Sequence, residues 1–192
     1  MFIHELLRAK SIEKYASCDA HFIQEKLDGW RLAIFKQRSG LTIATGKDQS
    51  GHLEFFARFP KLRRHRIIDQ LTRTMPIHSS VELEMISPFG PAATVITALQ
   101  ECPEKLSLVT FAFPFWDGAN QYHQPVSWAA SQAALLGVPF AQWSYRPTPF
   151  ARIEADQLRN RAEQAGLEGY ILKRSQYDGW WKIKCEETVD AV

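Results

Sequence analysis

The sequence has no apolar run long enough to cross a bilayer, and its first residues lack the basic and apolar regions of a signal peptide. We therefore expect a cytoplasmic protein that does not associate with a membrane. Cysteine is also scarce. The three cysteines, Cys18, Cys102 and Cys185, are odd in number and widely scattered, so neither a disulfide framework nor a zinc site is indicated.

An excess of charge of one sign is missing as well. The chain has 23 Lys and Arg against 21 Asp and Glu, and its net charge of +2 gives no overall attraction to polyanions, although a local one remains open. The glycine patterns with which P-loop and dinucleotide folds bind phosphate are absent, so a nucleotide would have to be bound in another way. With 192 residues, 45% of them hydrophobic, and no repeat or flexible linker, we expect one domain over residues 1–192.

Strand and helix patterns follow one another at uneven spacing. Alternation and turn residues predict strands over 31–36, 41–45, 80–86, 107–115, 169–173 and 181–184. Apolar residues at helical spacing predict helices over 59–74, 93–100, 126–136 and 153–165. This uneven order favours an α+β fold over a regular doubly wound one. The helix over 59–74 is rich in arginine; such a face is usually only solvated, and a DNA contact is the alternative.

One short run carries most of the chemical information. Residues 25–31 read E-K-L-D-G-W-R, which places Lys26 in the pattern K-x-D-G-x-R just ahead of a predicted strand. A lysine amine attacks a phosphoryl centre only when it is unprotonated, and a nearby cation such as Arg31 favours that state. Taken alone, the run fits an exposed Asp-Gly turn equally well.

The spacing resembles the nucleotidyl-lysine motif of ATP-dependent DNA ligases, RNA ligases and mRNA capping enzymes. Later segments resemble the other motifs of that superfamily, in the same order. They are Val81–Met85 with Glu84, Leu108–Gly118 with Phe111, Glu168–Lys173, and the Lys-x-Lys pair Lys182 and Lys184. The resemblance is to the adenylation (nucleotidyltransferase) domain of ATP-dependent DNA ligases and runs from about residue 21 to residue 192. It implies antiparallel sheets flanked by helices, in an ATP-grasp-like fold, with the nucleotide between the sheets.

The resemblance also implies the chemistry. Lys26 attacks the α-phosphate of ATP and carries AMP, which then passes to a 5′-phosphate at a nick before the 3′-hydroxyl closes the bond. The implied partner is nicked double-stranded DNA, in replication or repair, and the implied cofactors are ATP and Mg²⁺. We expect the chain to act as a monomer.

Each matching residue has an implied role. In the catalytic step Asp28 orients Lys26, while Lys182 and Lys184 contact the α-phosphate. Around the nucleotide, Gln24 faces the adenine amino group, Phe111 stacks on the purine, Arg31 contacts AMP or the 5′-phosphate, Glu84 and Glu168 hold the ribose and Mg²⁺, and Lys173 completes the Glu-Gly-x-x-x-Lys motif. Without the resemblance, Phe111, Phe113 and Phe115 alternate as core residues would, and Glu82 and Glu84 fit a solvated face or a salt bridge.

The chain departs from the ligase pattern at several positions. Lys47 stands near the place of a ribose-contacting arginine, Gln24 replaces a glutamate, and Ala112 replaces an aspartate. Only eight residues follow Lys184, so we expect the C-terminal OB-fold domain of ligases to be absent. The alternatives are an RNA ligase, an RNA-capping guanylyltransferase, or a non-catalytic module that binds nucleotides or DNA ends.

Overall fold

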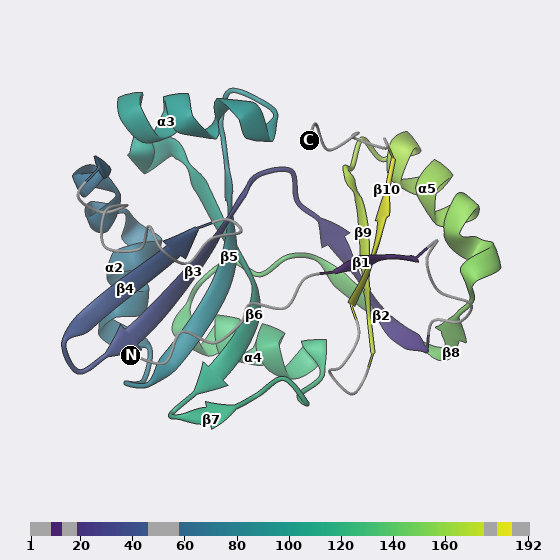
Figure 1. Ribbon diagram of the computed structural model, residues 1–192, viewed down its shortest axis with the longest axis horizontal. Coiled ribbons are helices and arrows are strands. Elements are labelled where there is room, and N and C mark those ends of the chain that lie inside the picture. The colour runs from purple at the N-terminus through teal and green to yellow at the C-terminus, as the bar shows by residue number, and fades with distance from the viewer. Residues whose placement is uncertain (1–8, 13–18, 46–57, 175–179, 186–192) are drawn as a thin grey trace. The chain divides into compact units, whose positions relative to one another are not determined.

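The structure is a computed structural model that describes residues 9–12, 19–45, 58–174 and 180–185 (Figure 1). The chain forms two compact units: unit 1 comprises Met1–Leu27 and Gln142–Val192, and unit 2 comprises Asp28–Ala141. Unit 2 is therefore one contiguous insertion in the sequence of unit 1. Each unit has its own sheet and its own apolar core.

Unit 2 is built on a five-stranded antiparallel sheet in the order β4-β3-β5-β6-β7. The strands are β3 (Trp30–Gln37), β4 (Gly40–Thr45), β5 (Ser79–Ile86), β6 (Ser107–Trp116) and β7 (Ala119–Asn120). Leu32 and Ile34 alternate with Arg31, Ala33 and Phe35 along β3, and Leu32 and Ile34 lie on the face of the sheet that forms the core. The four strands predicted in this unit are confirmed.

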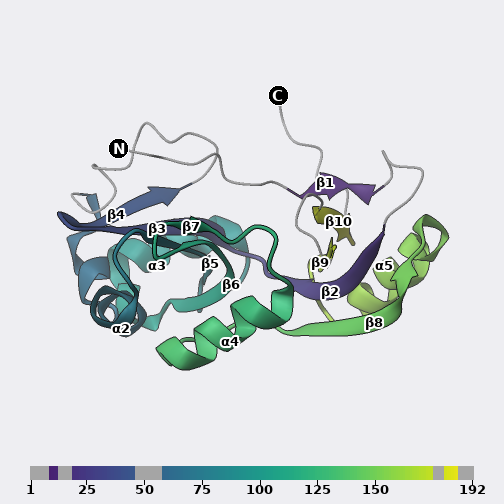
Figure 2. The ribbon, with the colours of Figure 1, turned by 90° about the horizontal axis from the view of Figure 1, so that it is seen from below.

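Helical segments cover that apolar face, and Figure 2 shows α2 and α4 on one side of β3 and β4. These segments are η3 (Pro60–Arg64), α2 (Arg66–Thr74), η4 (Ala92–Thr94), α3 (Val95–Glu101), η5 (Pro103–Lys105) and α4 (Val126–Leu136). Their buried side chains include Leu62, Ile68, Leu71, Leu99 and Ala133. The opposite face of the sheet carries polar side chains, among them Arg31, Glu82 and Glu84.

The predicted helix over 59–74 is wrong in one respect, because the chain breaks at His65 into η3 and α2. His65 has extended backbone angles (φ −62°, ψ 132°), and its imidazole accepts a hydrogen bond from Ile67 N at 3.2 Å as the N-cap of α2. The other ring nitrogen donates to Leu106 O at 3.0 Å. Burial lowers the pKa of His65, which favours the neutral ring that both bonds require.

Unit 1 contains a second five-stranded sheet, in the order β1-β10-β9-β2-β8. Its strands are β1 (Lys10–Ser11), β2 (Ala20–Lys26), β8 (Trp143–Phe150), β9 (Gly169–Lys173) and β10 (Trp180–Lys184). All neighbours are antiparallel except β1 and β10. The predicted strands β9 and β10 are confirmed, whereas β2, β8 and the short β1 and β7 were not predicted.

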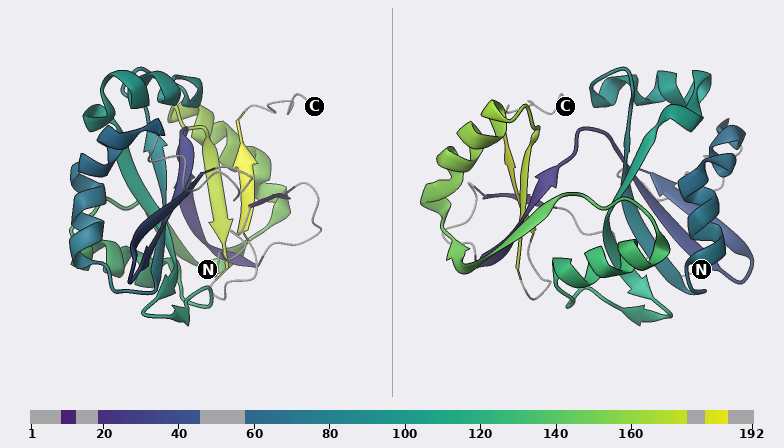
Figure 3. Two further views of the ribbon diagram at one scale, coloured as in Figure 1. Left: turned by 60° about the vertical axis from the view of Figure 1, so that its left-hand side comes forward. Right: turned by 180° about the vertical axis from the view of Figure 1, so that it is seen from behind.

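Helix α5 (Ala155–Gln164), which follows the short turn η6 (Arg152–Glu154), covers one face of this sheet (Figure 3). The core between them contains Ile12, Ile23, Leu158, Leu172, Trp181 and Ile183. Because strand residues alternate between faces, the other face carries the residues between these apolar ones.

An ion pair fixes the end of edge strand β8. The Arg146 guanidinium donates two hydrogen bonds to the Glu154 carboxylate, at 2.6 and 2.8 Å, and lies 3.9 Å from the centre of the Phe150 ring. These bonds, with a further one from Ala151 N, lower the pKa of Glu154 to about 2. Strand β8 also contains Pro147 and Pro149, which lack a backbone N–H, and proline within a sheet is common on edge strands.

Candidate functional site

Three rows of paired residues cross β2, β9 and β10 on the face of unit 1 opposite its core. The rows are Lys26, Gly169 and Lys184; Gln24, Ile171 and Lys182; and Phe22, Lys173 and Trp180. The strand register therefore brings together six predicted site residues of this unit, namely Gln24, Lys26, Lys173, Lys182 and Lys184 within the rows and Glu168 beside Gly169. Residues far apart in the sequence thus share one face of the sheet.

Glu168 lies between two of the lysines. The Lys26 ammonium forms an ion pair with Glu168 Oε2, and Lys184 Nζ lies 3.4 Å from Glu168 Oε1. All three side chains are partly exposed. The cluster has two cations for one carboxylate, which suits an anionic ligand such as a phosphate.

Glycine at position 169 is required by the close approach of β9 to β10. Gly169 has φ +152°, and a Cβ placed on it would lie 1.9 Å from Ile183 O. Any larger residue would push the strands apart. This contact explains the glycine of the Glu-Gly pair and keeps the row that joins Lys26 to Lys184 in register.

Two further polar side chains of this face are almost fully buried. Gln24 is 2% exposed, and its Nε2 has no hydrogen-bond partner within the described part of the chain. An unsatisfied buried amide costs about 1–3 kcal/mol, so Nε2 fits a ligand atom that accepts a hydrogen bond. The predicted contact with the adenine amino group would need the amide oxygen instead, and it stays a prediction. Lys173 is 3% exposed, and its Nζ lies 3.9 Å from the centre of the Trp180 ring. Its predicted nucleotide contact stays a prediction.

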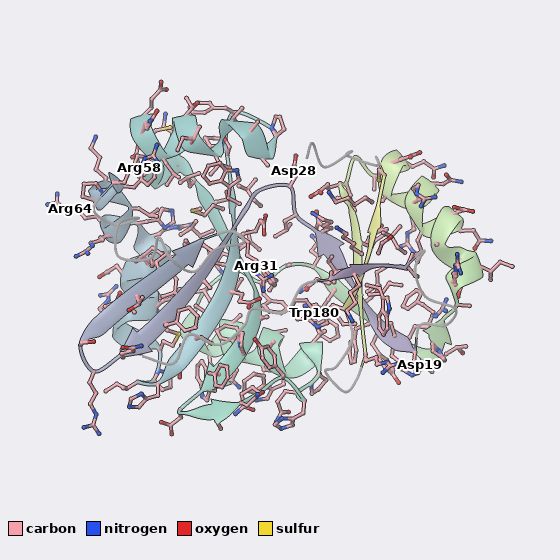
Figure 4. The ribbon with its side chains drawn as sticks, in the orientation of Figure 1. Asp19, Asp28, Arg31, Arg58, Arg64 and Trp180 are labelled. Atoms are coloured by element: carbon pink, nitrogen blue, oxygen red, sulfur yellow. The ribbon has the colours of Figure 1, made fainter. Side chains whose placement is uncertain are left out.

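Three of the residues predicted in unit 2, Arg31, Glu84 and Phe111, lie on the face of its sheet opposite the helices. Arg31 is paired in register with Glu84 on β5, and its guanidinium lies 5.6 Å from the centre of the Phe111 ring (Figure 4). Arg31 Nη2 also donates to Glu82 Oε2 at 2.6 Å. Glu82 is 1% exposed and was not predicted as a site residue; its place on the same strand face as Glu84 was the available signal. Of the two alternatives for Glu82, the salt bridge is confirmed.

A β-bulge determines where Phe111 points. Leu83 pairs with Thr110 and Glu82 with Ala112, so Phe111 is an extra residue on β6. Bulges of this kind redirect a side chain and recur beside functional sites. Phe113 lies in the core at 3% exposure, whereas Phe111 is partly exposed beside Arg31. The different environments of these two residues agree with the predicted assignment, but stacking on a base stays a prediction.

The Asp-Gly pair of the lysine motif is held within unit 2. A Cβ on Gly29 would lie 2.3 Å from Met85 O, so only glycine fits beside β5. Asp28 is exposed, and its Oδ1 accepts a hydrogen bond from Ala92 N at 3.4 Å (Figure 4). The structure thus gives Asp28 a contact with the start of η4, and its role in orienting Lys26 stays a prediction.

The predicted metal ligands, Glu84 and Glu168, do not belong to a preformed metal cluster. No group of three or more His, Cys, Asp or Glu residues is assembled within the described ranges. Mg²⁺ is commonly held by one or two carboxylates together with substrate phosphates, and the predicted roles of Glu168 in unit 1 and of Glu84 in unit 2 as metal ligands stay predictions. Lys47, which stands near the place of a ribose-contacting arginine, lies outside the described residues.

None of the helices in the described ranges has the length and apolar character needed to span a bilayer.

Comparison with solved structures identifies the fold. The chain is similar to mycobacterial DNA ligase D complexed with ATP (TM-score 0.56, 16% identity, 93% of this chain and 58% of that one). It is also similar to an archaeal ATP-dependent RNA ligase (TM-score 0.60, 15% identity, 94% and 48%). A third similar structure is a Naegleria gruberi RNA ligase variant with AMP and Mn (TM-score 0.61, 12% identity, 94% and 56%).

These likenesses confirm the predicted α+β nucleotidyltransferase fold of ATP-dependent ligases, with its two antiparallel-rich sheets. The chain spans about half the length of the structures that it matches. No protein-family model matches the sequence, and no curated protein matches it either.

Proposed function

We propose that this chain is the nucleotidyltransferase domain of an ATP-dependent polynucleotide ligase and that Lys26 carries AMP. The observation that supports the proposal most directly is the cluster of Lys26, Glu168 and Lys184 beside the buried amide of Gln24. It combines a nucleophile, cations for phosphate and a polar group suited to a base. The ligase fold provides the class of reaction.

In the first step the Lys26 amine attacks the α-phosphorus of ATP. An N–P bond forms, the bond from that phosphorus to the bridging oxygen breaks, and pyrophosphate leaves with the bonding electrons. An ammonium has no lone pair, so Lys26 must first lose a proton, and Glu168 Oε2 is the acceptor in contact with it. Lys184 and Lys182 would balance the charge of the α-phosphate. On unit 1, Glu168 would hold a divalent cation, and such a cation would neutralise phosphate charge when bound.

In the following steps AMP passes from Lys26 to the 5′-phosphate of a break, and the 3′-hydroxyl displaces it. We propose nicked double-stranded DNA as the substrate, on the resemblance of the motifs to DNA ligases. RNA ends are the second candidate, because RNA ligases with similar TM-scores share the fold. Sealing assays with matched nicked DNA and RNA duplexes distinguish the two substrates.

Covalent labelling tests the nucleophile. Incubation with ATP radiolabelled at the α-phosphate and Mg²⁺, followed by denaturing gel electrophoresis, should reveal one acid-labile, alkali-stable AMP adduct per chain. Lys26→Ala should abolish it, because the variant lacks the amine that contacts Glu168 Oε2. Lys105→Ala is the matched control, since Lys105 is an exposed lysine of unit 2, and it should label as the wild type does. An adduct that persists in Lys26→Ala, or that forms from GTP in preference to ATP, would contradict the proposal.

A further inference from the structure

The excess positive charge of the chain is concentrated in one segment of unit 2. Residues 58–74 hold six of the 23 Lys and Arg residues and one of the 21 Asp and Glu residues. The rest of the chain therefore carries more acids than bases, although the whole chain has a net charge of +2. The single carboxylate, Asp69, is paired with Arg73 at 2.7 Å.

The side chains of the remaining cations in this segment are exposed to solvent. Arg58, Lys61, Arg63, Arg64 and Arg66 are all exposed, and we call these five residues the basic surface. The apolar residues between them, Phe59, Leu62, Ile67 and Ile68, lie in the core of unit 2. Arg58 and Arg64 point away from the body of the unit (Figure 4). The break at His65 lets η3 and α2 both contribute to this surface.

The residues of the basic surface indicate which class of partner it binds. Four of its five cations are arginines, and guanidinium binds phosphate with two parallel hydrogen bonds. A helix that binds a membrane surface needs apolar residues free to insert, but here they are in the core. A protein interface centres on apolar or aromatic anchors, and no large hydrophobic residue in 58–74 is exposed. A phosphodiester backbone fits the surface better than either.

We infer that the basic surface docks the sugar-phosphate backbone of the polynucleotide, outside the nucleotide site. This inference rests on the proposed function for the class of substrate. Seven residues separate Arg58 from Arg66, and because the chain breaks at His65, the five cations come from two helical segments and the residues beside them. Several cations along one stretch of surface suit successive phosphates of a strand better than a single phosphate group. The contacts are to phosphates, so the surface binds without regard to sequence.

The test compares two triple variants with the same loss of charge. The first replaces Lys61, Arg64 and Arg66 with Gln, and the control replaces Arg38, Arg152 and Arg161, which are exposed cations elsewhere, with Gln. Binding of a fluorescent nicked duplex is measured by anisotropy at several salt concentrations, with DNA and RNA versions of the duplex. The first variant should bind at least tenfold more weakly and lower the salt slope by about 3, or about 1 per lost phosphate contact. The control should stay close to wild type.

Two further measurements show whether a loss of affinity comes from lost charge at the basic surface or from a loss of folding. A variant with Arg64→Lys and Arg66→Lys keeps the charge and should retain most of the affinity. Labelling of Lys26 with ATP should be unchanged in all variants, which also shows that they are folded. Labelling could fail even in the wild type while substitutions in the basic surface still weaken binding. That result would contradict the proposed function but would support the inference about the basic surface.

Three outcomes would overturn the inference. The first variant binds as the wild type does, the control loses as much affinity as the first variant, or poly-glutamate or anionic vesicles compete for the surface as strongly as nucleic acid does.

Discussion

Phe111 and Phe113 show how two residues of one type, two positions apart, acquire different environments. Simple alternation would place both on one face of β6, but the bulge at Phe111 and a second irregularity beyond Ala112 change the register. Phe113 consequently packs in the core, with its ring 5.7 Å from that of Trp116 and nearly perpendicular to it. Phe111 instead faces Arg31, whose guanidinium also donates to the buried Glu82.

Substitution of each phenylalanine should therefore have a different effect. Phe111→Ala should weaken ATP binding by about 1–3 kcal/mol, the usual loss when an aromatic stacking partner is removed, and should leave the unfolding free energy nearly unchanged. Phe113→Ala, the matched control, should lower the unfolding free energy by about 3–5 kcal/mol because it leaves a cavity. Calorimetric titration with ATP and urea unfolding measure the two quantities. A Phe111→Ala variant that loses stability but keeps its affinity per folded molecule would assign Phe111 to packing only.

At the scale of elements, the break at His65 couples the stability of unit 2 to pH. The pKa of His65 in the folded protein is below its ordinary value of 6.5, chiefly because of burial. Below pH 6.5 the unfolded chain therefore binds a proton more readily than the folded chain does. The stabilising contribution is complete above pH 6.5 and is lost as the pH falls toward the folded pKa.

We predict that His65→Asn will reduce the dependence of the unfolding free energy on pH below 6.5. Asparagine keeps a cap acceptor for Ile67 N but does not titrate. One proton contributes at most about 1.4 kcal/mol per pH unit to that slope. Urea unfolding between pH 5 and pH 7.5 measures the slope, with His123→Asn, at an exposed position, as the control. Equal slopes in wild type and His65→Asn would show that His65 is not the coupled group.

Sequence patterns predicted two kinds of element. Some, such as α4, have residues that serve only in packing, and others, such as β5, follow a regular alternation. Strand β2 was not predicted because Gln24 and Lys26 replace apolar residues on its functional face. Strand β8 contains two prolines, which argue against a strand except at an edge. The residues of the candidate site were found through motif order, whereas Glu82 needed the three-dimensional pairing with Arg31.

At the scale of the whole molecule, the contiguous insertion of unit 2 has a consequence for folding. Strands β2 and β8 pair Gln24 with Trp143, so more than a hundred residues lie between neighbouring strands of one sheet. Closing so long a loop in an unfolded chain costs about 4 kcal/mol in entropy, before any constant term. The contacts of unit 2 join residues that are closer in sequence, as in the hairpin of β3 and β4.

We therefore predict that unit 2 folds first and that unit 1 closes around the ends of the insertion. In pulsed hydrogen exchange during refolding, amides of β3 and β5 should gain protection before those of β2 and β8. Simultaneous protection of both sets would contradict this order.

This order would also determine when the chain becomes reactive. Lys26 is the last residue of β2, and its neighbours Glu168 and Lys184 come from the end of the sequence. In the proposed mechanism Lys26 would thus acquire its proton acceptor Glu168 and the neighbouring Lys184 in the last stage of folding. A nascent or partly folded chain would carry Lys26 without the groups proposed to assist it, so under this proposal it would not consume ATP before unit 1 is complete.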